Sequence, residues 1–298
     1  MQDKITVIYI ISDRRSGSTL LENMLSKSQE IISVGELAML RGHIFKDGPG
    51  VFWNWTCSCG KPILECAFWS KVLENIYDEK TFQTKTKWPF KSTKIALASF
   101  IKPLGCKTLW KYIHTPVNHK TINTIDEIYS TVSTISSKKF IVDSSKDPMH
   151  ALAISQCKHI DAKYIWLTRD IRAIAFSKVK RAKANKSSDK GVFRTLGTTL
   201  FFKKLCATAL RCLEGHDILT ISYEALAANP QQELDKISST FGLTNFAAPE
   251  YMELMNDHTI GGTPGRFERR KVKEDTSWKG YYNDKPALNA FGRFIDIL

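Results

Sequence analysis

The residues best suited to chemistry lie directly after the first apolar run of the chain. Ile5–Ile11 predicts a buried strand, and the stretch 12–21 that follows reads SDRRSGSTLL. A strand, a turn of small residues and a helix together aim free backbone N–H groups and the positive end of the helix at an anion. Arg15 adds a cation, Gly17 lets the backbone approach a ligand closely, and Ser18 adds a hydroxyl. This stretch therefore predicts a phosphate-binding loop.

The loop differs from the nucleotide-triphosphatase motif G-x-x-x-x-G-K-[ST] at two positions. Ser12 stands where the motif has its first glycine, and Ser18 stands where it has its lysine. Without that lysine, and with no clear acidic ligand for magnesium, hydrolysis of a nucleoside triphosphate is not favoured. A P-loop nucleotide or small-molecule kinase of the same architecture is therefore the first alternative function.

A second anion-binding position is predicted at the end of another strand. Tyr164–Leu167 is an apolar, aromatic run; Arg169 follows it, and Ser177 comes eight residues later. In a helix that begins near residue 171, Ser177 lies two turns in and can face the same ligand as Arg169. The alternative is a surface ion pair between Arg169 and Asp170.

Strand-like and helix-like segments alternate along most of the chain. Runs rich in β-branched and aromatic residues predict strands at Ile5–Ile11, Phe140–Val142, Tyr164–Leu167 and Ile218–Ile221. Helix-like segments follow at Ser18–Ser26, Pro148–Gln156, Ile171–Lys183 and Pro230–Phe241, and a long amphipathic helix is predicted at Phe193–Leu213. This order predicts an α/β, P-loop-like three-layer fold with a central parallel sheet flanked by helices.

Residues 48–120 break this alternation. The stretch contains prolines, glycines, clustered cysteines and the tryptophans Trp53, Trp55, Trp69, Trp88 and Trp110. Because ligands of open α/β sheets bind beyond the carboxyl ends of the strands, this insertion is a candidate wall of an acceptor site. The alternative is that its aromatic side chains fill a second small core. With no internal repeat or linker, the sequence predicts a single domain over residues 1–298.

These motifs occur in the order typical of sulfotransferases that use 3′-phosphoadenosine 5′-phosphosulfate (PAPS). The stretch 15–19, RSGST, resembles the 5′-phosphosulfate loop of the bacterial, carbohydrate and tyrosylprotein branch of that family. Arg169 with Ser177 resembles its 3′-phosphate motif. The stretch 143–148, DSSKDP, is similar to the K-D-P segment of tyrosylprotein sulfotransferases.

Two later segments extend the resemblance. Tyr223 begins a Y-E-x-L segment that matches one near the nucleotide in the family, and residues 258–279 resemble its closing loop. The resemblance implies that PAPS is the donor, that PAP (3′-phosphoadenosine 5′-phosphate) is its product, and that catalysis requires no metal. The cofactor-binding residues that it implies are Arg14, Arg15, Ser16, Gly17, Ser18, Thr19, Leu20, Arg169, Ser177, Tyr223, Arg266, Arg270, Lys271 and Trp278.

The resemblance also implies catalytic residues. Sulfuryl transfer is an in-line displacement at sulfur that fixed cations and N–H dipoles can stabilise; Arg15 and Lys146 are the expected cations. An alcohol acceptor must lose its proton as it attacks, so a base is expected near the sulfur. Glu36 is the predicted base, because it falls where tyrosylprotein sulfotransferases carry their catalytic glutamate. The alternatives are a helix-start role for Glu36 and a histidine base, at His43, His114 or His119.

The chain has seven cysteines. An odd number, mostly in apolar helical surroundings, favours reduced thiols; such positions are Cys157, Cys206 and Cys212. Three others cluster within ten residues: Cys57, Cys59 and Cys66. This cluster is compatible with structural zinc completed by His43 or a distant residue, with a disulfide, or with free thiols.

The net charge of +13 calls for an anionic partner. Residues 178–190 form either a solvated basic face or part of a binding surface, and residues 266–273 predict a ligand loop. A non-catalytic polyanion-binding module and a catalytically inactive family member are therefore further alternatives.

The main prediction is a cytoplasmic enzyme of secondary metabolism. No apolar run approaches the roughly 18 residues of a membrane span, and the start of the chain lacks a basic n-region. The expected acceptor is a hydroxyl or amine of a small molecule, such as a natural product or saccharide, and no nucleic-acid partner is expected. The sequence leaves the oligomeric state open.

Overall fold

The computed structural model describes residues 4–45, 56–74, 76, 102–113, 116–184, 191–252, 258–262 and 269–297. Its centre is a five-stranded sheet in the order β2-β3-β1-β4-β5, and every neighbouring pair is parallel. The strands are β1 (Ile5–Ile11), β2 (Ile31–Gly35), β3 (Phe140–Lys146), β4 (Ile160–Thr168) and β5 (Ile218–Ser222). The predicted α/β fold with a central parallel sheet is confirmed.

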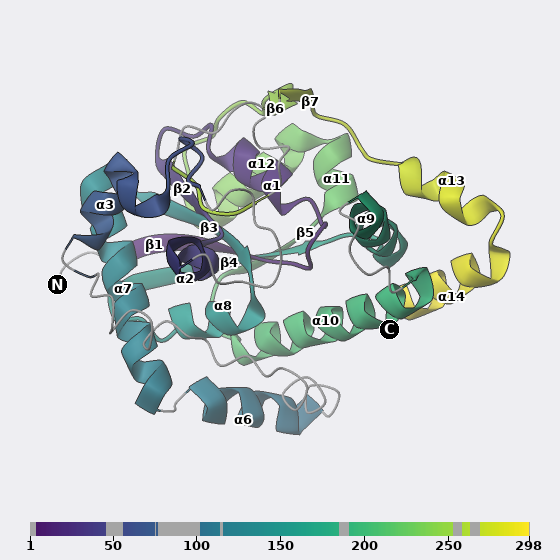
Figure 1. Cartoon of the computed structure of the whole chain (residues 1–298), viewed down its shortest axis with the longest axis horizontal. Coiled ribbons are helices and arrows are strands. Elements are labelled where there is room, and N and C mark those ends of the chain that lie inside the picture. The colour runs from purple at the N-terminus through teal and green to yellow at the C-terminus, as the bar shows by residue number, and fades with distance from the viewer. Residues whose placement is uncertain are drawn as a thin grey trace.

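Helices cover both faces of the sheet (Figure 1). Side chains of β1 alternate between two buried clusters, with Val7, Tyr9 and Ile11 in one and Ile8 and Ile10 in the other. The first cluster is completed by α7 (Pro116–Ser136), α8 (Pro148–Ile154) and α10 (Val192–Cys212). The second is completed by α1 (Ser18–Leu25), α11 (Tyr223–Ala228) and α12 (Pro230–Phe241).

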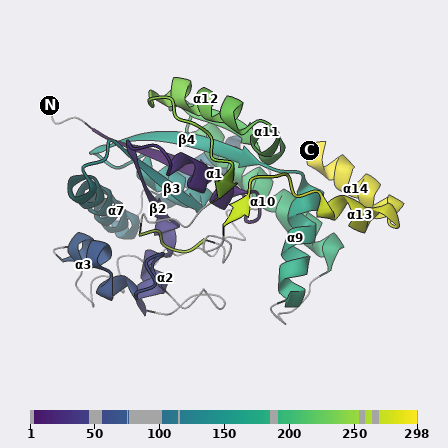
Figure 2. The same cartoon turned by 90° about the horizontal axis from the view of Figure 1, so that it is seen from above.

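A third buried cluster joins the helices at one end of the molecule. It contains side chains of α9 (Ile171–Ala184), α13 (Ser277–Asn283) and α14 (Pro286–Ile297), together with the start of α10. Figure 2 shows these helices at the end opposite α3 (Ala67–Leu73) and α7. The other elements are η1 (Leu37–Met39), α2 (Leu40–Phe45), η3 (Ile63–Glu65), α6 (Lys102–Ile113) and the antiparallel pair β6 (Tyr251–Met252) and β7 (Arg270–Lys271).

Several elements were not predicted, among them strand β2 and helices α7, α11, α13 and α14. The sequence of β2 is IISVG, and all its residues are buried although Ser33 is polar. This edge strand is difficult to predict because its apolar run is short and it ends in a glycine. Glu36 directly follows its last residue. The predicted bounds of α12 are those observed, and α1, α8, α9 and α10 differ from theirs by one or two residues at an end.

A disulfide overturns one cysteine prediction. Cys106 of α6 and Cys212 of α10 are bonded, with Cα atoms 5.5 Å apart, so the reduced thiol predicted at Cys212 is wrong. The partners are 106 residues apart in sequence, and only the packing of α6 against α10 brings them together. Cys157 and Cys206 are free and buried, as predicted.

The described tryptophans of the insertion belong to the main core. Trp69 is fully buried in the cluster that contains Tyr9, and Trp110 packs against the same cluster. Trp53, Trp55 and Trp88 lie outside the described residues. Among the described helices, none has the length and apolar character that a bilayer crossing requires.

Candidate active site at the carboxyl ends of the strands

Every strand of the sheet has a residue singled out from the sequence at or just beyond its carboxyl end. In sheet order these are Glu36 after β2, Lys146 ending β3, Arg15 after β1, Arg169 after β4 and Tyr223 after β5. Because the strands are parallel, all these ends lie at one edge of the sheet. That edge is where ligands of open α/β sheets bind.

The turn between β1 and α1 has the features of an anion-binding loop. Gly17 precedes α1 with a φ of 92°, and a Cβ atom there would run into the Tyr223 ring. Arg15 also has a positive φ, 77°. The hydroxyls of Ser12 and Ser16 are buried and have no hydrogen-bond partner among the described residues. Because unpartnered buried hydroxyls are costly, they fit a loop that completes its hydrogen bonds with a ligand.

The two arginines with predicted phosphate roles are joined directly. Arg169 Nη1 donates to the backbone carbonyl of Arg15 at 2.9 Å, and Arg15 Nε donates to Ser177 Oγ at 2.8 Å. The Arg169 guanidinium lies 4.1 Å from the centroid of the Tyr223 ring and pairs with the Asp275 carboxylate at 3.2 Å. The loop after β1, the end of β4 and the helix α9 therefore form one continuous surface.

Positive charge converges on this surface. Burial lowers the pKa of Arg15 to about 10, and the guanidinium groups of Arg181 and Arg169 contribute to the lowering. Arg181 was not singled out from the sequence. Burial lowers its pKa, which the nearby Glu36 carboxylate opposes. Arg181 lies one turn after Ser177 on α9, and this i, i+4 spacing is the signal that could have identified it.

Glu36 and Lys146 form a largely buried ion pair. Lys146 Nζ donates to Glu36 Oε1 at 2.7 Å and to the carbonyl of Ser144 at 2.7 Å. The N–H of Gly262 donates to the same Glu36 oxygen at 3.1 Å. Lys146 has a φ of 70° where the β1–β3 register shifts, and such irregularities re-aim side chains. The carboxylate is thus oriented by two donors, one of them a cation.

A second buried carboxylate, that of Glu22, bridges strands β2 and β3, at whose ends Glu36 and Lys146 lie. Glu22 of α1 accepts hydrogen bonds from Ser33 of β2 at 2.5 Å and from Ser144 of β3 at 2.7 Å. Burial raises the pKa of Glu22. The sequence did not identify Glu22, because its two serine partners come from different strands.

The alternatives to Glu36 as a base occupy different surroundings. His43 is buried in α2, His119 is exposed on α7, and His114 lies outside the described residues. Glu36 itself immediately precedes η1, so the helix-start position proposed for it coexists with its ion pair.

The other predicted cofactor residues are spread around the loop. In the first turn of α1, Ser18 and Leu20 are buried and Thr19 is half-buried, whereas Arg14 is exposed. Asp170, the alternative partner of Arg169, pairs with Arg172 at 2.5 Å.

The residues predicted to bind the cofactor from the closing loop, 258–279, lie in different surroundings. The charge of Arg270 acts on Arg15, whereas Lys271 is exposed and pairs with Glu250 at 3.3 Å. Trp278 is buried and stacks on Arg172, with 4.7 Å between the guanidinium carbon and the ring centroid. Arg266 lies outside the described residues.

A cleft of about 620 Å³ opens beside the phosphate loop. Ser16 and Arg169 line it together with Trp278 and Lys279 of α13. Its walls therefore combine loop hydroxyls, cations and an aromatic ring. The fold is that of a P-loop-like α/β protein, with its candidate site at the carboxyl ends of the parallel strands.

The sulfotransferase family model matches residues 8–247, a span that includes the phosphate loop, Glu36, Lys146, Arg169 and Ser177. The chain therefore belongs to the sulfotransferase family and is a transferase enzyme.

Two solved structures share the fold. The sulfotransferase domain from the curacin biosynthetic pathway is 16% identical, with a TM-score of 0.52 over 94% of this chain and 90% of that one. The sulfotransferase domain from the Synechococcus PCC 7002 olefin synthase is also 16% identical, with a TM-score of 0.52 over 99% and 96%. Among curated proteins, none matches the chain.

Proposed function

We propose that this sulfotransferase takes its sulfuryl group from PAPS and transfers it to a hydroxyl or amine of a small molecule. The observation that carries the proposal is the direct link between two arginines: Arg169 donates to the Arg15 carbonyl at 2.9 Å, and Arg15 donates to Ser177 at 2.8 Å. Such a surface suits one nucleotide that carries phosphates at both ends.

The residues present fit PAPS. The buried, unpartnered hydroxyls of Ser12 and Ser16 and the buried, unpartnered Nε of Arg169 are suited to phosphate oxygens. In the proposal the loop with Arg15 holds the 5′-phosphosulfate, and Arg169 with Ser177 holds the 3′-phosphate. A phosphate there would compete with Asp275, whose carboxylate pairs with Arg169 in the free protein.

Bound PAPS supplies an activated sulfuryl group, and PAP leaves when the bond to the 5′-phosphate breaks. Glu36 accepts the proton that the acceptor loses as its oxygen or nitrogen bonds to sulfur. Lys146 and Arg15 neutralise the negative charge that builds up on the reacting oxygens. The 2.7 Å contact between Lys146 and Glu36 supports this assignment, because it unites a cation and a base in one pair.

The acceptor is proposed to be a natural product or saccharide, bound against the insertion of residues 48–120. Trp69 is excluded from that wall because it is fully buried. A cytoplasmic location is also part of the proposal, and the disulfide Cys106–Cys212 is the observation that weighs against it. Thiol counting on protein taken directly from cells, under conditions that trap thiols, would decide between the two.

The test begins with nucleotide choice. Isothermal titration should show that PAP binds tightly, whereas ATP with magnesium binds far more weakly. Arg169→Ala should weaken PAP binding about 10- to 100-fold, because it removes charge-assisted hydrogen bonds. Arg211→Ala, on α10, is the matched control and should leave the affinity unchanged. Equal affinity for PAP and ATP with magnesium would favour the kinase alternative and contradict the proposal.

Transfer itself is measured with ³⁵S-labelled PAPS and a panel of phenols, saccharides and amines. Incorporation of label into any of them supports the proposal. DNA or heparin binding that falls steeply with salt, without PAP binding, would favour the polyanion-binding alternative.

A further inference from the structure

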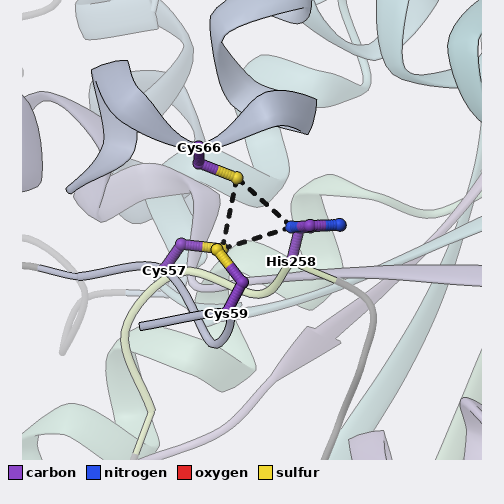
Figure 3. A group of neighbouring side chains, drawn as sticks. All are labelled: Cys57, Cys59, Cys66 and His258. Carbon is purple, nitrogen blue, oxygen red and sulfur yellow. Dashed lines mark hydrogen bonds between the residues drawn. The ribbon is translucent and has the colours of Figure 1, made fainter. Parts of the chain in front are cut away.

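Four potential metal ligands meet at the β2 edge of the sheet. Cys57, Cys59, Cys66 and His258 have ligand atoms that all lie within 4.8 Å of one another (Figure 3). Cys57 and Cys66 are fully buried, and Cys59 is exposed. The thiols come from the insertion, and His258 comes from a segment 201 residues further along the chain than Cys57.

The separations match the edges of a zinc tetrahedron. The Sγ atoms of Cys57 and Cys66 are 3.6 Å apart, and His258 Nδ1 lies 3.7 Å from the first and 3.2 Å from the second. Zinc bonds of roughly 2.3 Å to sulfur and 2.0 Å to nitrogen place two sulfur ligands about 3.8 Å apart and a sulfur and a nitrogen about 3.5 Å apart. These three ligand atoms need shifts of only a few tenths of an ångström to surround one ion, and the Cys59 ligand atom lies within 4.8 Å of each of them.

We propose that these four side chains bind one Zn²⁺ in a structural Cys₃His site. Three thiolates and an imidazole in tetrahedral arrangement are a zinc donor set. All four positions are filled by protein, so no position remains for a substrate or water, and the role is structural. Each thiol gives up its proton when it binds the ion.

The local backbone presents the ligands in a defined way. Cys57 and Cys59 lie in a tight turn closed by the Cys57 N–H to the Lys61 carbonyl at 2.9 Å and the Gly60 N–H to the Cys57 carbonyl at 2.9 Å. Gly60 takes a φ of 84°, which this turn requires. The turn places the Sγ atoms of Cys57 and Cys59 within 4.8 Å of each other.

His258 is held by groups outside the cluster. The indole N–H of Trp69 donates to its carbonyl at 2.6 Å, and the Phe68 ring stacks on the imidazole at 5.4 Å between centroids, with 8° between the planes. Contacts of this kind orient a metal ligand. They also explain why Trp69 is buried rather than available to an acceptor.

The site connects the insertion to the candidate base. Next to His258, Thr259 exchanges hydrogen bonds with Ser58: the Ser58 N–H donates to the Thr259 carbonyl at 3.0 Å, and the Thr259 N–H donates to Ser58 Oγ at 2.9 Å. Ile260 then pairs with the end of β2, since the Glu36 N–H donates to its carbonyl at 2.7 Å.

The same short segment orients the Glu36 side chain through the Gly262 N–H. We therefore infer that zinc fixes residues 258–262 and, through them, positions Glu36. The positioning role rests on the proposed function of Glu36, whereas the metal site does not.

The first test is the metal content of the intact protein. After purification without chelators, plasma mass spectrometry should find about one zinc per chain. Replacement by Co²⁺ should give the visible bands of tetrahedral cobalt and a thiolate charge-transfer band. Protein that contains no zinc and takes up neither Zn²⁺ nor Co²⁺ would overturn the proposal, as would a Cys57–Cys66 disulfide in that protein.

Variants at His258 separate the metal from folding. His258→Gln should lose the zinc, whereas His258→Cys should keep it, because thiolate replaces imidazole in a Cys₄ site. Cys157→Ser removes a buried thiol outside the cluster and should keep the zinc. Retention of full zinc by His258→Gln would remove His258 from the site.

Hydrogen exchange tests the link to Glu36 without any acceptor. In His258→Gln, amides of residues 34–36 should exchange faster than in His258→Cys, while those of residues 20–25 in α1 should not change. Unchanged exchange at 34–36 after zinc loss would refute the positioning role. Zinc binding without any PAP binding would instead contradict the proposed function and leave the metal site intact.

Discussion

The proposed donor side (the loop 12–17 with Arg169 and Ser177) and the β2 edge of the same sheet are built in different ways. On the donor side, β1, the loop 12–17 and α1 are consecutive in the chain. Gly17, with its positive φ, sets the backbone conformation of the turn into α1. At the β2 edge, the Cys57–His258 cluster and the Gly262–Glu36 contact join residues more than 200 positions apart. A phosphate loop can be recognised from one stretch of sequence, whereas the contacts at the β2 edge join segments that are far apart in sequence and cannot be recognised from any one of them.

Their electrostatics differ as well. Burial lowers the pKa of Arg15, and the nearby guanidinium groups of Arg181 and Arg169 lower it further. Glu36, by contrast, is paired one-to-one with Lys146. In the proposed function, the donor side binds the charged nucleotide, and Glu36 at the β2 edge accepts one proton. Mutations on the two sides should therefore separate binding from turnover.

The largest expected effect is on turnover at the β2 edge. Glu36→Gln keeps the size and an oxygen acceptor but removes the proposed base, so the transfer rate should fall about 10²- to 10⁴-fold. The PAP affinity should not change, because the arginines on the donor side remain. Initial rates with labelled PAPS and titration with PAP measure the two quantities.

The matched control for this prediction is Glu127→Gln, at an exposed position of α7. It should leave both rate and affinity unchanged. If Glu36→Gln turned over normally, Glu36 would have no part in proton transfer. The β2 edge would then differ from the donor side in structure but not in a catalytic role.

A smaller effect is expected from the donor-side backbone. Gly17→Ala should cost about 1 kcal/mol for the left-handed conformation and add a collision with the Tyr223 ring. The start of α1 would shift, and PAP binding should weaken at least about 10-fold as its N–H groups turn away. Denaturant unfolding and PAP titration report the two losses.

Gly242→Ala separates strain from collision. Gly242 has a φ of 75°, and a Cβ atom there would meet nothing within 4 Å. This variant should lose similar stability and keep its PAP affinity. Equal loss of PAP affinity in both variants would mean that global destabilisation, and not the geometry of the loop, explains the Gly17 result.

The same contrast explains how far the sequence could lead. The alternation of strands and helices, the turn between β1 and α1, and the placement of Arg169 at the end of β4 and of Ser177 on α9 could be predicted, because each lies within a short stretch with its own periodicity or spacing. Strand β2 could not, because its apolar run is short and its buried Ser33 has its hydrogen-bond partner, Glu22, in a different element. The fourth cluster ligand, His258, and the Cys106–Cys212 disulfide depend on contacts across more than 100 residues.

The predictions on catalytic roles depended on resemblance rather than on spacing. Nothing in the stretch around Glu36 marks it as a partner of Lys146, since 110 residues separate them. Their meeting follows from the parallel order β2-β3, which brings both strand ends to the same edge. Arg181 lies within the basic run 178–190, and only its i, i+4 relation to Ser177 on α9 distinguishes it from the other cations of that run.

The smallest expected effect on the unsubstituted protein comes from the buried pair Asp143 and His150, in β3 and at the start of α8, which lie between the two sides. Burial raises the pKa of Asp143 to about 7 and lowers the pKa of His150, 3.9 Å away, to about 3. Between about pH 4 and 6.5 the folded pair holds one proton on Asp143, and the unfolded chain holds one on its histidine, so the pair should leave stability independent of pH.

His150→Gln should expose the Asp143 contribution, and stability should then fall with rising pH by up to about 1.4 kcal/mol per unit, because the folded state binds the extra proton. In Asp143→Asn the stability should instead rise with rising pH, because the unfolded state, with its protonated histidine, then binds the extra proton. Unfolding by denaturant across this range measures both slopes; equal slopes in the two variants would show that the pair does not share its proton in this way.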